Sequence, residues 1–536
     1  MSPRRWKKEP PFAGKWRVLA AALVAVLIFS GVAFAGNEPE QGKAKYVFLF
    51  IGDGMGVAQR RAAELFLGKI KGVGRSEEAR LVMNTFPAQG LNTTSDLTSV
   101  IPDSASAATA ISSGHKTASG VIGMDPGDKI SYENIAETAK KKQMKVGIIT
   151  TVSLDHATSA AFYAHVPSRE QMYDISMQLA NSRMDFFAGG QLQKPEDKKN
   201  PGKPKALDVA RKNGFTVVTG RAAFEALEPG GGRVIAMNAP VDQDQAMNFT
   251  IDQRYGRGQV TLAEYLAKGI KLLDNPQGFF IMAEGGKIDW ACHANDAGAA
   301  IHDTLALDEA VAEAVKFYRQ RPRETLIVVT GDHETGGMSI GFAGAQYAFF
   351  MDNIRQQKMS YLQFNKELNA YKNTPPRDSA RFEDLLPLIK VAFGLYKMAA
   401  EEKNALEQKV DAGKAPGASP EAKKAGEDAE KKLKDSLALS DLELKALKDA
   451  FKQTMLSPKE RAQDDRAYLL YGGYEPLTVR LTTILNNKAG IGWTTYAHTG
   501  APVQTSALGV GAELFNGYYD QTDIYRKIVQ ITGLTR

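Results

Sequence analysis

Cysteine is nearly absent from this 536-residue sequence, and histidine and tryptophan are scarce. There is one cysteine, Cys292, alongside seven histidines and four tryptophans. A single thiol cannot form an internal disulfide, which excludes a disulfide-stapled fold. Apolar residues make up 43% of the chain, enough to build a large core. Stability must therefore come from that core, and bound metal ions could add to it.

Basic charge is also lacking outside the N-terminus. Six basic residues and one acidic residue lie within residues 1–35, so that segment carries +5 of the total net charge of +6. The rest of the chain is close to neutral, and nothing in it argues for a nucleic-acid partner. No later apolar run reaches the roughly 20 residues of a membrane span.

The N-terminal segment, residues 1–35, has the parts of a secretory signal peptide. Basic residues precede the apolar run VLAAALVAVLIF, and the small residues AFA stand before Gly36. We therefore expect an exported protein, periplasmic in a bacterium, with no stable membrane association after cleavage. The apolar run is short for a membrane span, and an uncleaved N-terminal anchor is the alternative.

Short apolar runs that end in polar or glycine-rich turns recur along the chain and predict buried strands. Amphipathic helical patterns, such as residues 131–144 and 300–320, lie between them. This alternation predicts an α/β fold with a mostly parallel central sheet and helices on both faces. The predicted strands lie within residues 46–56, 145–158, 185–190, 214–220, 278–289 and 325–337.

Residues 346–480 differ from the rest because they lack histidine, cysteine and tryptophan, and much of this segment is rich in Lys, Glu and Ala. Ser440 and Glu443 form a capping-box pattern, and Ser419 with Pro420 marks another helix start. We predict a helical insertion at 346–480 that interrupts a catalytic core of residues 36–345 and 481–536. The insertion could cap the site, dock a partner or be solvated decoration.

Acidic residues and histidines collect just past the predicted strand ends, where ligands bind in open α/β sheets. Several carboxylates at one sheet edge would repel one another without cations, so the pattern predicts metal binding. Imidazole mixed with carboxylate suits zinc, whereas oxygen ligands suit magnesium. The candidates are Asp53, His156, Glu284, Asp289, His293, Asp332, His333 and His498.

A serine in the stretch PDSASAATA, residues 102–110, is a candidate nucleophile at a predicted helix start. No histidine precedes it in the chain, so a neighbouring imidazole base is not evident. Arg169, which ends the stretch AFYAHVPSR, offers a planar fork that can bind two phosphate oxygens.

Six motifs together resemble the alkaline phosphatases, a family of phosphomonoesterases with two zinc ions and one magnesium ion. The motifs occur in the family's order and span residues 46–343 and 490 to near the C-terminus. The resemblance implies hydrolysis of small phosphate monoesters through a covalent phosphoserine. Family members are often dimers, so a homodimer is an option that the insertion could block. The motifs are FIGDGMG, PDSASAATA, SLDHATSAAFYAHVPSR, AEGGKIDWACHANDA, GDHETGG and HTGAPV.

The resemblance also implies a role for each candidate residue. Ser104 matches the nucleophile, Arg169 the phosphate clamp and Asp103 the residue that positions this arginine. The two zinc sites match Asp289, His293 and His498, and Asp53, Asp332 and His333; the magnesium site matches Asp53, Thr158 and Glu284.

Two positions depart from part of the family near the third metal and the phosphate. His156 stands where some members have aspartate, and Trp290 where others have lysine or histidine. They leave the identity of the third metal open.

Two other functions stay open as well: hydrolysis of diesters by a related two-metal enzyme, and a non-catalytic exported protein that binds metal or phosphate. The sulfatase branch would need a C-x-P-x-R type stretch, which DSASA lacks.

Overall fold

The structure is a computed structural model that describes residues 43–73, 79–253, 258–374, 379–435 and 437–535. The predicted signal peptide, residues 1–35, lies outside these residues. Among the described residues, no helix has both the length and the apolar character that crossing a membrane requires.

A ten-stranded sheet forms the centre of the fold, and the α/β prediction is confirmed. Its strand order is β14-β2-β13-β8-β1-β7-β3-β4-β6-β5, and every pairing is parallel except those of β13 with β2 and β8. The strands are β1 (Tyr46–Gly52), β2 (Ala88–Thr93), β3 (Lys145–Thr150), β4 (Phe186–Gly189), β5 (Phe215–Thr219), β6 (Arg233–Met237), β7 (Phe279–Glu284), β8 (Thr325–Gly331), β13 (Val503–Gly509) and β14 (Gly517–Asp520).

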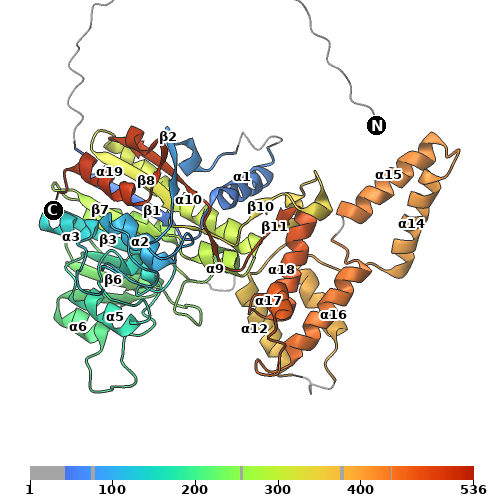
Figure 1. The fold of residues 1–536 in the computed structure, drawn as a ribbon, viewed down its shortest axis with the longest axis horizontal. Coiled ribbons are helices and arrows are strands. Elements are labelled where there is room, and N and C mark those ends of the chain that lie inside the picture. The colour runs from blue at the N-terminus through green and yellow to red at the C-terminus, as the bar shows by residue number, and fades with distance from the viewer. Residues whose placement is uncertain (1–42, 74–78, 254–257, 375–378, 436, 536) are drawn as a thin grey trace, which may run out of the picture. The chain divides into compact units, whose positions relative to one another are not determined.

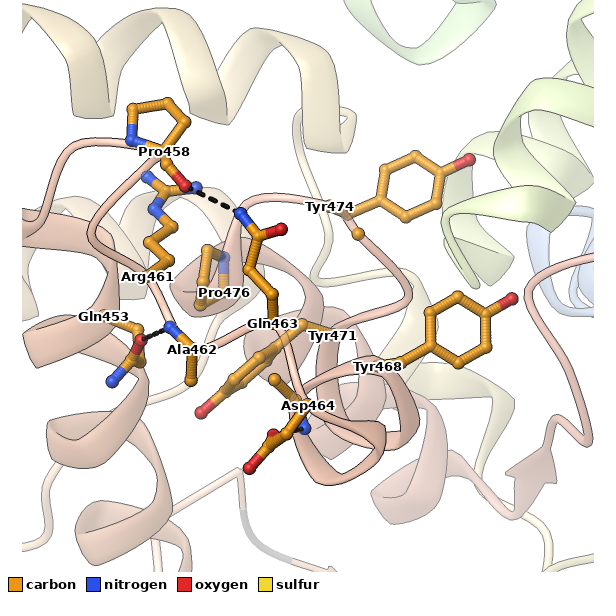
Figure 2. Close-up of a pocket in the computed structure, with 12 residues that line it drawn as sticks. Gln453, Pro458, Arg461, Ala462, Gln463, Asp464, Tyr468, Tyr471, Tyr474 and Pro476 are labelled. Carbon is orange, nitrogen blue, oxygen red and sulfur yellow. Dashed lines mark hydrogen bonds between the residues drawn. The ribbon is translucent and has the colours of Figure 1, made fainter.

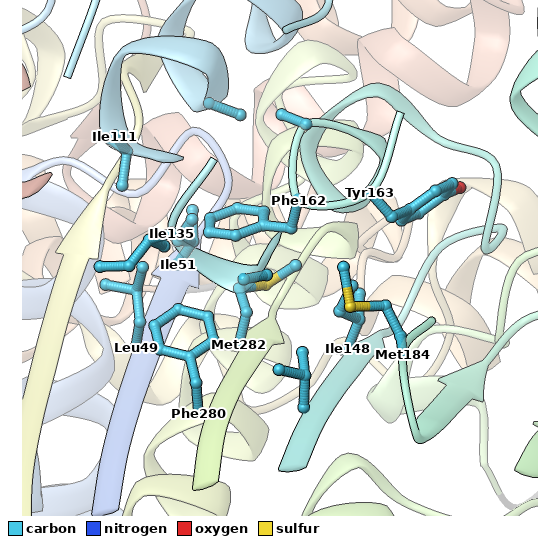
Figure 3. Close-up of a cluster of buried hydrophobic side chains, with 14 of the residues drawn as sticks. Leu49, Ile51, Ile111, Ile135, Ile148, Phe162, Tyr163, Met184, Phe280 and Met282 are labelled. Atoms are coloured by element: carbon cyan, nitrogen blue, oxygen red, sulfur yellow. The ribbon is translucent and has the colours of Figure 1, made fainter. Parts of the chain in front are cut away.

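Helices cover both faces because the buried strands present apolar side chains on both sides. In β1, Val47, Leu49 and Ile51 enter one buried cluster, whereas Phe48 and Phe50 enter another. Figure 3 shows Leu49 and Ile51 beside Phe280, Met282 and Ile111 in the first cluster. This first face is covered by α2 (Ser104–Ser113), α3 (Ile135–Lys141), α4 (Ala157–Ala160), α5 (Met172–Asn181), α6 (Ala206–Lys212) and α19 (Thr522–Thr532).

The second face carries the longest helix of the core, α10 (Ala297–Gln320), whose buried side chains pack on β1 and β8. Asp296 caps it by accepting a hydrogen bond from the Ala299 amide. The neighbouring helices on this face are α1 (Val57–Lys71), α7 (Arg221–Glu225), α8 (Leu262–Leu273) and α9 (Lys287–His293).

From Met351 to Ala489 every described element is a helix, and several of these helices pack around α18 (Pro476–Ala489) in a buried cluster that also includes residues of α1 and α10. The capping box of Ser440 and Glu443 and the helix start at Pro420 occur as predicted. The α14 and α15 helices form a hairpin with a small core of its own (Figure 1). The other helices are α11 (Met351–Ile354), α12 (Tyr361–Lys372), α13 (Leu386–Phe393), α14 (Ala400–Lys414), α15 (Pro420–Asp435), α16 (Asp441–Met455) and α17 (Asp465–Tyr471).

Candidate metal centre

The carboxyl ends of three adjacent central strands bring acidic residues to one edge of the sheet. Asp53 follows β1, Glu284 ends β7 and Asp332 follows β8, and the pairing register sets Ile51 beside Glu284 and Gly52 beside Gly331. Each strand end thus delivers one carboxylate to the same place. All three side chains are fully buried.

Two further segments complete this site. The α9 helix places Asp289 and His293 one helical turn apart. His498 arrives on the short strand β12 (His498–Thr499), which pairs antiparallel with β9 (Glu334–Thr335) directly after His333. Residues separated by more than 400 positions in the sequence therefore meet at one sheet edge.

The predicted carboxylate and histidine ligands fall into three groups. Within each group, the ligating atoms lie within 4.8 Å of one another. Asp289, His293 and His498 form the first group, in which the two imidazole Nε2 atoms lie 3.1 Å apart. The second and third groups share Asp53. They consist of Asp53, Asp332 and His333, and of Asp53, His156 and Glu284.

Unpaired buried oxygens indicate that these groups fit metal ions. Asp53 Oδ1, Asp332 Oδ2 and both carboxylate oxygens of Glu284 are buried without a hydrogen-bond partner among the described residues. Buried carboxylates are costly unless a donor or a cation compensates them. The donor set of carboxylates and imidazoles is that of zinc sites, with oxygens that also suit magnesium.

The pKa values of the protein groups alone reflect this crowding. Burial and the neighbouring Asp332 raise the pKa of Asp53 well above its ordinary value, and burial raises the pKa of Glu284 to about 7. For Asp289 burial acts in the same direction, but His293 and His498 outweigh it and lower the pKa. The site thus holds more negative charge than its imidazoles can balance, which cations would relieve.

Backbone carbonyls orient two of the imidazoles. His293 Nδ1 lies 2.6 Å from the Tyr496 carbonyl oxygen, and His498 Nδ1 lies 2.8 Å from that of Pro102. Donation from Nδ1 leaves Nε2 free to bind a metal. In both residues, Nε2 lies within 3.5 Å of Asp289 Oδ1.

Gly54 is required at this edge by close packing. Its φ of +69° lies in the left-handed region, and a Cβ there would lie 2.7 Å from Thr335 Oγ1 and 2.9 Å from Asp289 Oδ1. Its amide donates to Asp332 Oδ1 at 3.1 Å. The glycine after Asp53 thus lets the β1 turn approach the ligands.

Ser104 is the first residue of α2 and lies beside the second group. Its side chain is 2% exposed, and Oγ lies 3.2 Å from His333 Nε2. Asp103 caps the helix by accepting from the Ser106 amide. Ser106 Oγ donates to Asp96 and Asp103, so it is occupied in holding the turn.

Arg169 reaches the same place from the loop after α4. Its Nη1 donates to Asp103 Oδ2 at 3.0 Å, and its Nη2 lies 3.4 Å from His156 Nε2. Burial raises the pKa of Asp103, but Arg169 and three donors to its carboxylate outweigh this and bring it to about 2. Asp103 therefore stays ionised and fixes one side of the guanidinium.

The third group includes His156, which we expected near the third metal. Its ligating atom lies within 4.8 Å of those of Asp53 and Glu284. Its Nδ1 is buried without a hydrogen-bond partner among the described residues. Thr158 Oγ1 lies 3.4 Å from Asp53 Oδ2, and the Trp290 ring is 6.1 Å from that of His156.

Sequence reasoning missed several residues that support the site. Thr335 Oγ1 donates to Asp289 Oδ1 at 2.6 Å, and the Tyr496 and Pro102 carbonyls orient imidazoles. The position of Thr335 in the motif GDHETGG could have identified this residue. Contacts from the backbone carbonyls of distant loops leave no such signal in the sequence. Lys287 was also missed; it is buried, and its Nζ donates to Asp242 at 2.6 Å.

Comparisons with known proteins show a family and several relatives that this chain resembles. The family described as "Alkaline phosphatase" matches residues 44–425. Alkaline phosphatase 3 of Bacillus subtilis (strain 168) is 27% identical, over 96% of this chain and 96% of that protein.

Two solved structures share the fold. The cold-active alkaline phosphatase of the psychrophile Shewanella sp. is 24% identical, with a TM-score of 0.66 over 92% of this chain and 100% of that one. A mutant of the alkaline phosphatase TAB5, with Mg bound in its M3 site, is 22% identical, with a TM-score of 0.56 over 93% of this chain and 100% of that one. At these identities the likeness establishes the fold alone.

Proposed function

The chain belongs to the alkaline phosphatase family, and from that premise we propose that it hydrolyses phosphate monoesters through a covalent phosphoserine at Ser104. The position of Ser104 carries the proposal. Its hydroxyl is buried at a helix start, 3.2 Å from His333 Nε2 and beside carboxylate oxygens that lack partners.

We propose that the first group, Asp289, His293 and His498, and the second group, Asp53, Asp332 and His333, each hold a zinc ion. Asp53, Glu284 and Thr158, with His156, would hold the third metal, which we expect to be magnesium. When bound, such ions act as Lewis acids that lower the pKa of a coordinated hydroxyl and offset charge on phosphate oxygens.

The chain's own residues bind and orient the phosphate. Arg169 offers its guanidinium to two phosphate oxygens, and Asp103 holds that guanidinium through Nη1. The N-terminus of α2 presents backbone amides to the anion at Ser104. This fixed positive environment stabilises the charge that spreads over the equatorial oxygens during phosphoryl transfer.

Two displacements complete the proposed reaction. Ser104 Oγ forms a bond to phosphorus as the bond to the leaving alcohol oxygen breaks; overall, the serine loses a proton and the alcohol gains one. Water then attacks the phosphoserine, releases inorganic phosphate and returns Ser104 to its hydroxyl form. The burial of Ser104, at 2% exposure, keeps bulk water from competing in the first step.

Replacement of Ser104 by alanine tests this proposal. We expect S104A to lose turnover of a chromogenic phosphate monoester while its zinc content, measured by atomic absorption, stays near that of the unmodified protein. Ser106→Ala is the matched control and should keep turnover. Normal turnover by S104A would contradict the proposal, and a higher kcat/KM for a diester than for the matching monoester would overturn the substrate class.

We further propose export under the direction of residues 1–35, to the periplasm in a bacterium. The net charge of the rest of the chain, close to neutral, gives no attraction for nucleic acid. A homodimer is the expected assembly if the insertion leaves room for it. Analytical ultracentrifugation of the mature chain would decide between monomer and dimer.

A further inference from the structure

Three tyrosines form an aromatic wall beside the candidate metal centre. Tyr468 comes from α17, Tyr474 from the turn that follows it, and Tyr496 from the loop that leads to His498. The ring centroids of Tyr468 and Tyr474 each lie 6.3 Å from that of Tyr496. These separations are within the range of aromatic contacts. We call these three residues the tyrosine wall.

The wall is joined directly to a predicted zinc ligand. The Tyr496 carbonyl oxygen lies 2.6 Å from His293 Nδ1. Burial and then the negative charge of Asp289 raise the pKa of Tyr474, which sets this side chain within electrostatic reach of the first ligand group. The tyrosine wall is therefore adjacent to the first ligand group.

The wall also lies on the open side of the metal centre. The His293 and His498 side chains are 26% and 13% exposed, whereas Asp53 and His333 of the second group are at 0%. A substrate whose phosphate reaches Ser104 must project the rest of itself toward the exposed side. That side is bordered by Tyr496.

The wall is exposed at Tyr468, whereas Tyr474 is partly buried and its ring packs against that of Tyr361. Tyr468 is 56% exposed, and a cavity of about 380 Å³ is lined by Tyr468, Tyr471 and Tyr474, but not by Tyr496 or a predicted metal ligand. Figure 2 shows Tyr468 and Tyr474 projecting in the same direction, whereas Tyr471 points the opposite way. No hydrogen bond to a described residue engages the hydroxyls of the tyrosine wall.

We propose that the tyrosine wall binds a planar aromatic group on the alcohol side of the phosphate monoester. The inference rests on the proposed function, because it assigns the phosphate to Ser104 and Arg169. Planar rings stack on aromatic side chains with little demand for sequence or hydrogen bonds, and each such contact changes affinity about 5- to 150-fold. The aromatic group could be a nucleobase or a simple aryl ring, since both present the same face.

Matched substrate pairs test the proposal, because the two members of each pair release the same class of primary alcohol. Adenosine 5′-monophosphate is paired with ribose 5-phosphate, and benzyl phosphate with cyclohexylmethyl phosphate. We expect Tyr474→Ala and Tyr468→Ala to lower kcat/KM for an aromatic member at least about 5-fold, while its non-aromatic partner stays nearly unchanged. The pair that responds identifies the source of the ring.

Two control variants separate binding from folding. Tyr474→Phe keeps the ring and should keep the preference, and Tyr518→Ala removes an exposed tyrosine of β14, outside the cavity, and should change neither pair. Equal losses for both members in a folded, zinc-loaded variant, or no change in either pair, would overturn the inference. A failure of the proposed function would look different, because S104A would then keep its turnover of all four esters.

Discussion

Gly472 lies in the helical segment rather than in the core, yet its replacement by alanine should weaken zinc binding. It ends α17 with a left-handed φ of +58°. A Cβ there would lie 2.2 Å from Tyr496 Cγ, whereas ordinary contact begins at 3.4 Å. The tyrosine ring would have to move by about 1.2 Å, the difference between these two distances.

That movement would reach His293. The Tyr496 carbonyl lies 2.6 Å from His293 Nδ1, and moving the residue would weaken this contact. Loss of such an outer partner of a metal-binding histidine costs about 10- to 100-fold in metal affinity. The left-handed backbone itself costs an alanine about 1–2 kcal/mol of folding free energy. Two separate effects are therefore expected, one on zinc affinity and one on stability.

Gly473→Ala separates the two effects. Gly473 also has a positive φ, +81°, but a Cβ there meets no atom within 4 Å. In competition with a zinc chelator, Gly472→Ala should lose about 10- to 100-fold in affinity while Gly473→Ala stays near the unmodified protein. A second change, Tyr496→Ala, removes the crowded ring and should restore zinc affinity to Gly472→Ala. Equal affinities in both glycine variants would refute the reasoning.

Three other predictions concern the clamp, the core and the hairpin. Asp103→Asn removes the charge partner of Arg169 and should raise the KM for a phosphate monoester about 10-fold with a smaller change in kcat. The pKa of Asp103 is lowered from 3.8 to about 2, so its contribution to the free energy of unfolding is present above pH 3.8 and is lost as the pH falls through about 2. This loss is measured by comparing the acid unfolding of the unmodified protein with that of Asp103→Asn. Lys287→Met leaves Asp242 buried without its cation and should lower the free energy of unfolding, measured in urea, by about 3–5 kcal/mol. The double variant Lys287→Met with Asp242→Leu should recover much of this loss. A short glycine linker in place of residues 400–435 should leave kcat/KM unchanged, because Tyr396 and Ala438 already pair where the hairpin begins and ends. Loss of activity in this variant, if it is folded, would show that the hairpin shapes the site.

Six strands lie within the predicted segments: β1, β3, β4, β5, β7 and β8. β6 was missed although it is short, apolar and mostly buried, and β2 and β14 were missed because they mix polar and glycine residues. The stretch DAGKAPGA, residues 411–418, predicts a turn between two helices, and this is partly wrong because α14 continues to Lys414. Its Gly413 packs against Gly426 of α15, and this helix contact is invisible in a local pattern.

The candidate metal ligands were easier to predict than the residues that hold them in place. Asp53, Glu284 and Asp332 stand at strand ends, and the parallel sheet brings strand ends together. The sequence cannot show that His156, at the start of α4, lies beside Asp53 and Glu284, because the fold of that turn sets its position. The contact of Gly472 with Tyr496 was beyond prediction, since it depends on how the helical segment packs on a loop of the core.

The covalent intermediate at Ser104 is the central claim, and acid quenching followed by mass spectrometry tests it most directly. Protein mixed with a phosphate monoester and quenched during turnover should carry phosphate on the peptide that contains Ser104, with fragmentation placing it on Ser104 rather than Ser106. S104A, loaded with zinc, should carry none. Phosphate on another residue, or full turnover with an unlabelled Ser104, would contradict the account.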